Sequence, residues 1–378
     1  MTAKIRVGVI FGGRSGEHEV SIRSARAVVE ALDPQRYGVI PIAIEHDGRW
    51  LSPVESAGML PEETRRLLPD DIIGGPKSAV AIIGDPSRPG LIRLNCDGEE
   101  TAPKALDVIF PVIHGTYGED GTIQGLLEMA GVPYIGCGVL ASSCGMDKVT
   151  MKALFREADL PVCRHIWFLR GEWERELEVV LLKVEEVIGY PCFVKPANLG
   201  SSVGISRAVD RQTLEAAVNL AARYDRKVIV EEGLDAREIE CAVIGNDEPD
   251  ASLPGEYVIL DERAAFLDYT EKYSGTGHVE FVVPANLPEH TTSRVQELAK
   301  RAFRAVDGSG LARVDFFLRR DNGELLLNEL NTMPGLTQVS GYPKLWAASG
   351  LPFESVLDRL IQLAFERHQD KMRNQTRL

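Results

Sequence analysis

Residues 313–335 carry the sequence RVDFFLRRDNGELLLNELNTMPG, in which two apolar-rich runs flank the segment Asp321-Asn322-Gly323. This pattern is typical of a β-hairpin with a three-residue loop, where glycine supplies the positive φ that such a loop needs. A three-residue loop also fixes the register of the two strands. The predicted cross-strand pairs are Arg320 with Glu324, Asp315 with Glu329, and Arg313 with Asn331.

Because side chains alternate between the faces of a strand, one face of this hairpin is predicted to be polar and the other apolar. The polar face carries Arg313, Asp315, Glu329 and Asn331. The apolar face is predicted to enter a core through Val314, Phe316, Leu318, Leu326 and Leu330. Two carboxylates and an amide gathered in this way suit Mg²⁺, with substrate phosphates filling the remaining coordination positions. The hairpin alone leaves a second interpretation open, which is a solvated face with a surface ion pair.

Composition excludes several classes of function. The chain has 378 residues, enough for two or three domains, and a formal net charge of −14 that argues against nucleic acid and membranes as partners. We expect no membrane span, and no signal peptide in the opening MTAKIRVGVIFGG. The six scattered cysteines lack a CxxC pair, which favours free thiols in a reducing compartment. A cytoplasmic location is therefore expected.

The N-terminal part has the pattern of an α/β domain with a doubly wound parallel sheet. A buried strand at residues 5–11 leads into a glycine-rich turn at residues 12–16, and a helix follows to about Leu32. The turn lacks GxGxxG spacing, so its predicted use is to bring Glu17 to the carboxyl edge of the sheet. A second glycine loop, HGTYGEDG, begins at His114 after a later buried strand. That histidine is a candidate catalytic residue, or simply part of a turn held by backbone groups.

Residues 49–103 form the least informative part of the chain. They are rich in proline and glycine, with short strands expected near residues 79–83 and 91–95. We interpret them as an elaboration of the first domain, without identifiable chemistry.

Residues 162–232 show the order β-α-β-loop-β-α-β, which indicates a small open α+β domain. Its loop ANLGSSVG, residues 197–204, offers backbone N–H groups and two hydroxyls to a phosphate, although a polar hairpin tip is the alternative. Lys195 at the preceding strand end favours the phosphate interpretation. Walker A and protein-kinase motifs are absent, so ATP would bind by another scheme. Residues 266–275, FLDYTEKYSG, have the composition of a lid.

Seven segments, in this order along the chain, resemble the ATP-grasp ligases and within them the D-alanine–D-alanine ligase family. They are FGGRSGEHEVS, HGTYGEDG, MDKVTMK, KPANLGSSVG, DYTEKYSG, ARVDFF and NELNTMPGLTQVSGYPKLW. The resemblance implies an ATP-grasp architecture of three domains, at residues 1–146, 147–236 and 237–378. It implies that ATP phosphorylates the carboxylate of one D-alanine, that the amine of a second D-alanine attacks, and that phosphate leaves. It also implies a homodimer acting on small-molecule substrates.

The same resemblance implies ATP and two Mg²⁺ ions (or Mn²⁺) as cofactors. The residues expected at the ATP phosphates are Lys148, Lys195, Gly200, Ser202 and the lid residue Lys272. Those expected around the adenine and ribose are Phe193, Ile205, Glu231, Glu232, Leu234, Glu238 and Phe266. The expected metal ligands are Asp315, Glu329 and Asn331. Where this chain has Glu232 the family often carries lysine, so a side-chain contact with the adenine is not expected at that position.

The resemblance further implies how the two D-alanine molecules are held. Glu17 would bind the ammonium group of the first, with His114 close by. Ser201, hydrogen-bonded with Glu17 and Tyr273, would tie the first domain to the lid. The oxyanion site would consist of Arg313 and the N–H of Gly335. The carboxylate of the second D-alanine would be received by Ser340 and Gly341.

Three rival functions differ in what they require of this sequence. A D-alanine–D-lactate ligase, or another carboxylate–amine ligase of the same fold, is the nearest rival, and Tyr273 speaks against the first. A nucleotide-binding regulator without turnover should have lost a metal ligand or Arg313, yet all are present. A nicotinamide oxidoreductase would leave the acidic residues of the hairpin unexplained.

Overall fold

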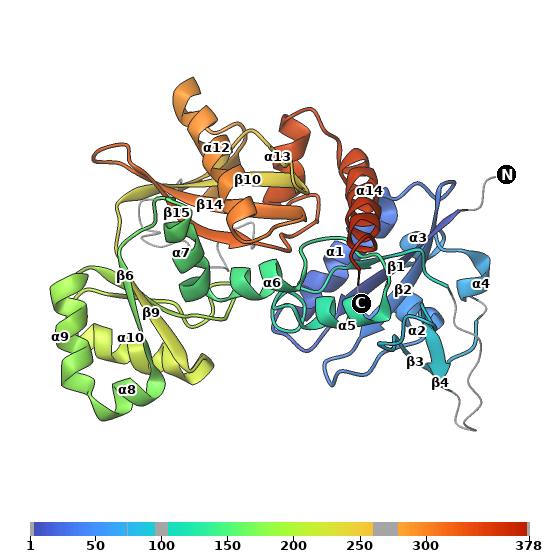
Figure 1. The fold of residues 1–378 in the computed structure, drawn as a ribbon, viewed down its shortest axis with the longest axis horizontal. Helices are drawn as coiled ribbons and strands as arrows, with labels where there is room; N and C mark the ends of the chain where they lie inside the picture. The colour runs from blue at the N-terminus through green and yellow to red at the C-terminus, as the bar shows by residue number, and fades with distance from the viewer. Residues whose placement is uncertain (1–3, 74, 95–104, 260–278, 376–378) are drawn as a thin grey trace.

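The computed structural model describes residues 4–73, 75–94, 105–259 and 279–375. Three bodies are visible in Figure 1, each built on its own main sheet. One contains β1 and β2, a second contains β6 and β9, and the third contains β10, β14 and β15. The α/β class with a parallel N-terminal sheet is confirmed, and none of the helices described is long and apolar enough to cross a membrane.

The first sheet is parallel, with the strand order β2-β1-β5. Its strands are β1 (Ile5–Gly12), β2 (Tyr37–Ile44) and β5 (Val108–Pro111), and its helices include α1 (His18–Ala31) and α5 (Thr122–Ala130). β2 and β5 are buried throughout, and β1 is buried from Val7 onward, because both faces of a parallel sheet are covered. The chain leaves β1 and β5 at the same edge, so Glu17 and the loop that begins at His114 come together there, as predicted.

Residues 49–94 add short elements to this first body. These are α2 (Pro53–Gly58), α3 (Glu62–Arg65), α4 (Asp70–Ile73), β3 (Ala79–Ala81) and β4 (Ile92–Leu94). The two predicted short strands are confirmed, and they pair with each other. The helices were not predicted because each has six residues or fewer, too short for an apolar period to show.

The central body has an antiparallel sheet of order β6-β9-β7-β8, which confirms the predicted succession of elements. Its strands are β6 (His165–Leu169), β7 (Cys192–Pro196), β8 (Ser206–Ala208) and β9 (Lys227–Glu232). Its helices are α8 (Arg170–Arg175), α9 (Leu177–Val187) and α10 (Arg211–Tyr224), so the first helix of the predicted order is divided into two. The apolar faces of these helices share one core with the sheet.

Two further helices, α6 (Val139–Met146) and α7 (Lys148–Glu157), connect the first body to the central one. The carboxylate of Asp147 accepts hydrogen bonds from the backbone N–H groups of Val149 and Thr150, which caps α7. This cap places Lys148 in the first helical turn, as predicted.

The third body has an antiparallel sheet of order β13-β12-β10-β14-β15, with β11 paired to β10. Its strands are β10 (Ala236–Gly245), β11 (Asp250–Ala251), β12 (Gly255–Ile259), β13 (Val279–Val282), β14 (Gly310–Arg319) and β15 (Leu325–Asn331). Helix α12 (Glu289–Ala305) packs its apolar residues against β10 and β14 to form a core. The sheet therefore has one face in this core and one face toward the polar side chains described below.

The predicted hairpin exists, and its register is confirmed where the polar residues lie. Arg313 pairs with Asn331, and Asp315 pairs with Glu329. The prediction is wrong at the tip, where Arg319 rather than Arg320 bonds to Glu324. The connecting loop is one residue longer than predicted, and a β-bulge at Asn328 adds one residue to β15. The longer loop shifts the register by one residue and the bulge shifts it back, so the polar residues beyond the bulge pair as predicted.

The prediction that Leu326 points into the same core as Val314 and Phe316 is wrong. Phe317 pairs with Leu326, so Leu326 is buried on the face opposite the core that holds Val314 and Phe316. Leu325 and Leu327 enter that core instead.

Helix α14 (Phe353–Lys371) belongs to the third body by sequence, and it packs between the third body and the first. Its residues Val356, Leu357 and Leu360 share a core with β1 and β2, and α14 lies beside α1 in Figure 1. The hydroxyl of Tyr37 donates to Asp358 at 2.7 Å. The helix before it, α13 (Gly341–Ala348), was not predicted, because Gly341 and Pro343 favoured a loop. The domain boundaries at 146/147 and 236/237 stay a prediction.

Candidate active site

A cavity of about 980 Å³ lies where the three bodies meet. Every predicted site residue that the structure describes, apart from Gly341, contributes to its lining. Gly341 lies next to the lining residue Ser340, and a side chain on it would collide with the Glu240 carboxylate at 2.7 Å. Phe266, Lys272 and Tyr273 lie outside the described residues, as does the rest of the predicted lid at 266–275.

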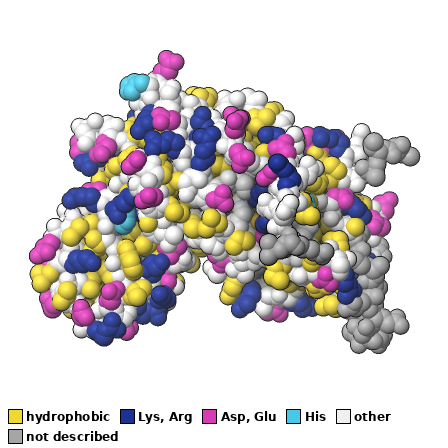
Figure 2. Space-filling view, viewed as in Figure 1, with side chains coloured by type: hydrophobic (Ala, Val, Ile, Leu, Met, Phe, Trp, Pro, Cys, Tyr) yellow, Lys and Arg dark blue, Asp and Glu magenta, His cyan; other side chains and the backbone are white. Residues whose placement is uncertain are grey.

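The cavity lining brings basic side chains together with a larger number of acidic ones. On the face shown in Figure 2, basic and acidic side chains are interspersed. Within the cavity, Lys148, Lys195 and Arg313 line one continuous space. These three cations can face an anionic substrate, and the carboxylates beside them are suited to a divalent cation.

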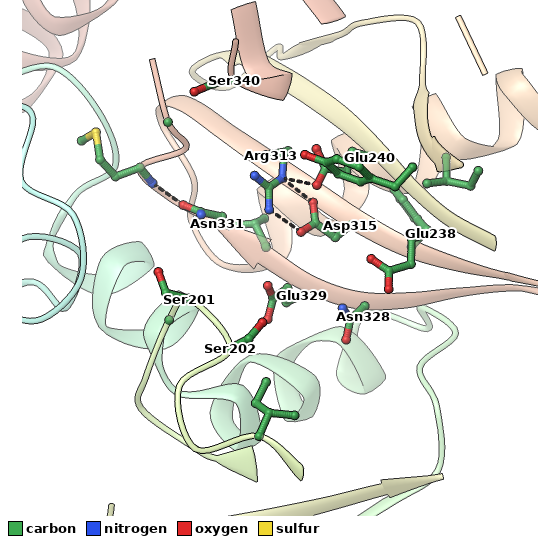
Figure 3. A pocket seen from close by; sticks show the side chains of 18 of the residues that line it. Ser201, Ser202, Glu238, Glu240, Arg313, Asp315, Asn328, Glu329, Asn331 and Ser340 are labelled. Atoms are coloured by element: carbon green, nitrogen blue, oxygen red, sulfur yellow. Dashed lines mark hydrogen bonds and ion pairs between the residues drawn. The ribbon is translucent and has the colours of Figure 1, made fainter. Parts of the chain in front are cut away.

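Arg313 occupies the middle of the polar hairpin face. Its Nε and Nη2 donate to the two carboxylate oxygens of Asp315 at 2.7 and 2.6 Å. Its Nε also lies 3.3 Å from Oε1 of Glu240, a residue of β10 that pairs with Asp315 (Figure 3). Two carboxylates therefore orient the guanidinium group. Glu240 was not predicted from the sequence, although its alternation with Glu238 places both on one face of β10.

Oxygen atoms suited to a divalent cation gather beside Arg313. Asp315 and Glu329 face each other across the hairpin, and both line the cavity (Figure 3). The amide oxygen of Asn331 accepts the backbone N–H of Met333 at 2.9 Å, which fixes that side chain. Nζ of Lys148 lies 3.7 Å from Oε2 of Glu329. Carboxylate and amide oxygens each keep a further lone pair, so this donor set fits Mg²⁺ or Mn²⁺.

Two lysines approach the same space from the central body. Lys148 donates from Nζ to the carbonyl oxygen of Leu199 at 2.7 Å, and Lys195 lies 2.7 Å from Oε2 of Glu231. Burial lowers the pKa of Lys195, but the Glu231 carboxylate outweighs it and the net pKa is raised. Burial raises the pKa of Glu231, but Lys152 and Lys195 outweigh it and hold the pKa well below the usual range. Both groups are therefore charged at neutral pH.

The glycine loop between β7 and β8 closes one side of the cavity. Ser201 and Ser202 both adopt left-handed backbone conformations, with φ of 53° and 56°. Such conformations cost on the order of 1–3 kcal/mol each and concentrate at functional sites. The Ser201 hydroxyl donates a hydrogen bond to the Glu17 carboxylate, so the loop also contacts the first body. In Figure 3 the two serines lie across the cavity from Arg313.

Glu17, His114 and Glu119 form a buried titratable cluster at the edge of the first sheet. Burial, followed by the charge of Glu119, raises the pKa of Glu17 above its ordinary value. Burial lowers the pKa of His114, but Glu119 and then Glu17 outweigh it, so the net pKa is raised. The imidazole lies 3.1 Å from the carbonyl oxygen of Met333 through Nδ1 and 2.9 Å from the Ser24 hydroxyl through Nε2. These contacts hold His114 between the first and third bodies.

Glu232 has a partner on the side of β6. Its Oε2 lies 2.9 Å from Nε of Arg164, and its Oε1 accepts the Arg164 backbone N–H at 2.7 Å. The carboxylate is therefore engaged by arginine. The absence of a side-chain contact between Glu232 and adenine stays a prediction.

A strained glycine loop facing an acidic antiparallel hairpin across a cavity of this size is the arrangement of the ATP-grasp ligases. Family models described as the N-terminus and the C-terminus of D-ala D-ala ligase match residues 6–137 and 154–362. The chain belongs to the D-alanine–D-alanine ligase family.

Individual relatives agree over the full length. A D-alanine–D-alanine ligase of Heliobacterium modesticaldum is 50% identical over 373 residues, which are 99% of this chain and 98% of that protein. One from Ruminiclostridium cellulolyticum is 46% identical, covering 99% of each.

Solved structures show the same fold. The D-alanine–D-alanine ligase of Coxiella burnetii has a TM-score of 0.80 and 36% identity, covering 98% of this chain and 96% of that one. The VanG D-Ala:D-Ser ligase of Enterococcus faecalis has a TM-score of 0.81 and 35% identity, covering 96% and 100%.

Proposed function

We propose that the cavity between the three bodies is the active site for D-alanine ligation. The chain is a ligase that joins two D-alanine molecules at the expense of ATP, giving D-alanyl-D-alanine for peptidoglycan synthesis. One observation supports this location above all others. Arg313, Asp315 and Glu329 line the same cavity as Lys148 and Lys195, so metal-binding and phosphate-binding groups face one space.

In the first step, a carboxylate oxygen of the first D-alanine attacks the γ-phosphorus of ATP, and ADP leaves. Glu17 is the proposed partner of the D-alanine ammonium group, with His114 beside it. Lys148 and Lys195 neutralise the phosphates, and Lys272 is assigned to the γ-phosphate. Two Mg²⁺ or Mn²⁺ ions, held by Asp315, Glu329 and Asn331, would supply further charge neutralisation there.

The nucleotide is assigned to the side of the cavity that the central body lines. Gly200 and Ser202 cover the phosphates, and Glu238 takes the ribose hydroxyls. The residues assigned to the adenine are Phe193, Ile205, Glu231, Glu232 through its backbone, Leu234 and Phe266. Of these, all but Phe266 lie in the described part of the chain and line the cavity.

In the second step, the amine of the second D-alanine loses a proton and attacks the acyl carbon, and phosphate leaves. Arg313 and the N–H of Gly335 stabilise the oxyanion. Ser340 and Gly341 receive the carboxylate of the second D-alanine. They are the N-cap and the first residue of α13, where the helix end favours an anion. Tyr273, with Ser201 and Glu17, is assigned to lid closure, which keeps water from the acyl phosphate.

We further propose a cytoplasmic homodimer with domains at 1–146, 147–236 and 237–378. The five cysteines in the described residues are free thiols, which supports a reducing compartment. Resemblance to the family supports the dimer. Sedimentation of the purified chain at micromolar concentration tests it, because a monomer at every concentration would contradict the proposal.

The decisive assay for the function is phosphate release from ATP with and without D-alanine, together with identification of the product. We expect release that depends on D-alanine and stops when EDTA removes divalent ions. Manganese titration in the presence of ADP should give two bound ions per chain. D-alanine offered together with D-lactate should give dipeptide, and the relatives named above do not favour the ester-forming alternative.

A further inference from the structure

A buried lysine lies behind the proposed active site, and none of the roles given above involves it. Lys152 is the second lysine of MDKVTMK, four residues after Lys148, so both lie on one face of α7. Its side chain is 1% exposed. Burying an ammonium group is costly unless partners compensate it, and its contacts therefore identify what it holds.

The ammonium group of Lys152 contacts three separate parts of the chain. Nζ donates to the carbonyl oxygen of Asn328 at 2.7 Å and lies 3.0 Å from Oε1 of Glu231. It also lies 3.6 Å from the sulfur of Cys163. An ammonium group has three N–H donors. Hydrogen bonds join it to Asn328 and Cys163, and an ion pair joins it to Glu231. Asn328 belongs to the third body, whereas Glu231 belongs to the central one.

The contact with Asn328 reaches toward the proposed metal site. Asn328 lies at the β-bulge of β15, directly before the predicted metal ligand Glu329. A bulge locally disrupts the ladder and re-aims the neighbouring side chain. The bond from Lys152 fixes the carbonyl of this irregular position, next to Glu329 in the chain (Figure 3). It thereby fixes the backbone from which the Glu329 side chain comes within 3.7 Å of Lys148 Nζ.

The contact with Glu231 reaches toward the proposed phosphate site. One carboxylate oxygen of Glu231 faces Lys152 at 3.0 Å, and the other faces Lys195 at 2.7 Å. The carboxylate lies between two buried cations, and this arrangement fixes the direction of the Lys195 side chain. The same lysine thus contacts a group that orients Lys195 and a group that orients Glu329.

We propose that Lys152 is a positioning residue for the ATP-dependent step, which sets the spacing between the phosphate-binding Lys195 and the metal ligand Glu329. This inference rests on the function proposed for the cavity. The competing explanation is that Lys152 merely neutralises Glu231 and stabilises the fold. The two explanations differ in what happens to metal binding when the charge is kept but its geometry is changed.

The test measures binding rather than turnover. Calorimetry with ADP, and then with Mg²⁺ added to the ADP complex, gives the two dissociation constants separately. Lys152→Met keeps an unbranched side chain and removes the ammonium group. We expect the Mg²⁺ constant to rise by about 10- to 100-fold, the range seen when a group supporting a metal ligand is lost. The ADP constant should rise as well, because Glu231 then pulls Lys195 toward itself.

Two companion variants separate the two contacts of Lys152. Glu231→Gln keeps the bond from Lys152 to Asn328 while removing the charge beside Lys195. It should weaken ADP binding and leave the Mg²⁺ constant within about twofold of wild type. Lys152→Arg keeps the charge near Glu231, but a planar guanidinium cannot reproduce the convergent contacts that the ammonium group makes with Asn328 and Glu231. It should therefore fold and still bind Mg²⁺ more weakly, which keeps the test valid where Lys152→Met does not fold.

A matched control lies at the other end of α7. Nη2 of Arg301 donates to the carbonyl oxygens of Ala158 and Asp159 at 2.8 and 3.2 Å, tying α12 to the end of α7. Arg301→Met removes a comparable cation–carbonyl contact far from the cavity lining. We expect a lower melting temperature with unchanged ADP and Mg²⁺ constants.

The outcomes are distinct. Wild-type Mg²⁺ constants in both Lys152 variants, with only melting temperature lowered, would overturn the positioning role and leave the function intact. A wild-type chain that binds no ADP would instead overturn the proposed active site itself. If Lys152→Arg binds Mg²⁺ more weakly while the Mg²⁺ constant of Glu231→Gln stays near that of the wild type, then Lys152 acts through its geometry rather than its charge.

Discussion

The hydroxyl of Ser201 donates a hydrogen bond to the carboxylate of Glu17, a residue 184 positions earlier in the chain. This bond joins the glycine loop of the central body to the N-cap residue of α1. It also acts on the acid itself, because it opposes the burial and the Glu119 charge that raise the pKa of Glu17. A contact that closes the cavity therefore also helps keep the proposed ammonium-binding group ionised.

Ser201→Ala tests this relationship. Without the hydroxyl the pKa of Glu17 should rise further, so ionised Glu17 becomes scarcer as the pH falls. Hydrogen bonds to charged groups contribute about 1.5–3 kcal/mol, so KM for the first D-alanine should rise by roughly tenfold or more. The acidic limb of its pH dependence should move to higher pH. Steady-state kinetics between pH 5.5 and 8 measures both, and an unmoved limb would contradict the link.

Asp315→Asn and Glu329→Gln test the proposed metal ligands. Each removes a charged oxygen ligand, so phosphate charge stays uncompensated and phosphoryl transfer should stop while the fold persists. Asp321→Asn is the matched control, because that residue pairs with Arg319 at the exposed tip of the same hairpin. D-alanine-dependent phosphate release and circular dichroism measure the outcome. Near wild-type turnover in either active-site variant would make the hairpin face structural.

Arg313→Met tests the oxyanion role. Loss of one preorganised donor typically lowers turnover by about 100- to 1,000-fold. We expect kcat to fall much more than KM for ATP rises, because the guanidinium is proposed to stabilise charge that develops only during the reaction. A change restricted to KM for ATP would assign Arg313 to nucleotide binding.

Glu119→Gln tests the buried cluster through pH. The pKa of His114 is raised in the folded chain, so protonation of His114 stabilises the fold. This stabilisation is complete at a pH below the pKa of the unfolded chain, and it is lost as the pH rises through the pKa of the folded chain. Glu119 provides the chief contributions that raise this pKa, so the variant should lose most stability below about pH 6.5. The deficit should shrink as the pH rises, and relief of repulsion with Glu17 acts in the same direction. Melting temperatures from pH 5.5 to 9 measure the trend, which a pH-independent deficit would refute.

Tyr273→Phe tests substrate choice, although that residue lies outside the described part of the chain. Deleting the phenolic hydroxyl should loosen the link between lid and Ser201 while preserving the ring. We expect some D-alanyl-D-lactate in addition to dipeptide, with the ester favoured at lower pH where the D-alanine amine is protonated. Product analysis with both acceptors across pH measures this. Dipeptide alone at every pH, at an unchanged rate, would place the specificity elsewhere.

Sequence patterns predicted which polar residues of the hairpin pair across its two strands, but they did not predict the length of its loop or the bulge in β15. Alternation and a glycine turn paired Asp315 with Glu329 correctly, but only because the longer loop and the bulge offset each other. The bulge at Asn328 could not be predicted, because nothing in the local residue types distinguishes a bulged strand from a regular one. Lys152 was missed for a related reason. A lysine on an amphipathic helix suggests a solvent-exposed side chain, and only the tertiary packing of α7 against β9 and β15 shows it buried.

Helix α14 has a consequence for the order in which the molecule can be completed. Its apolar residues share the core of the first sheet with residues of β10, β14 and α13, although they are synthesised after both other sheets. Domains emerging from a ribosome generally fold from the N-terminus onward. Here the first sheet must wait with part of its apolar surface uncovered until α14 arrives. A nascent chain interrupted before Phe353 would present that surface to chaperones or to other chains. The body that carries Glu17 would therefore be the first to be synthesised and among the last to complete its folding.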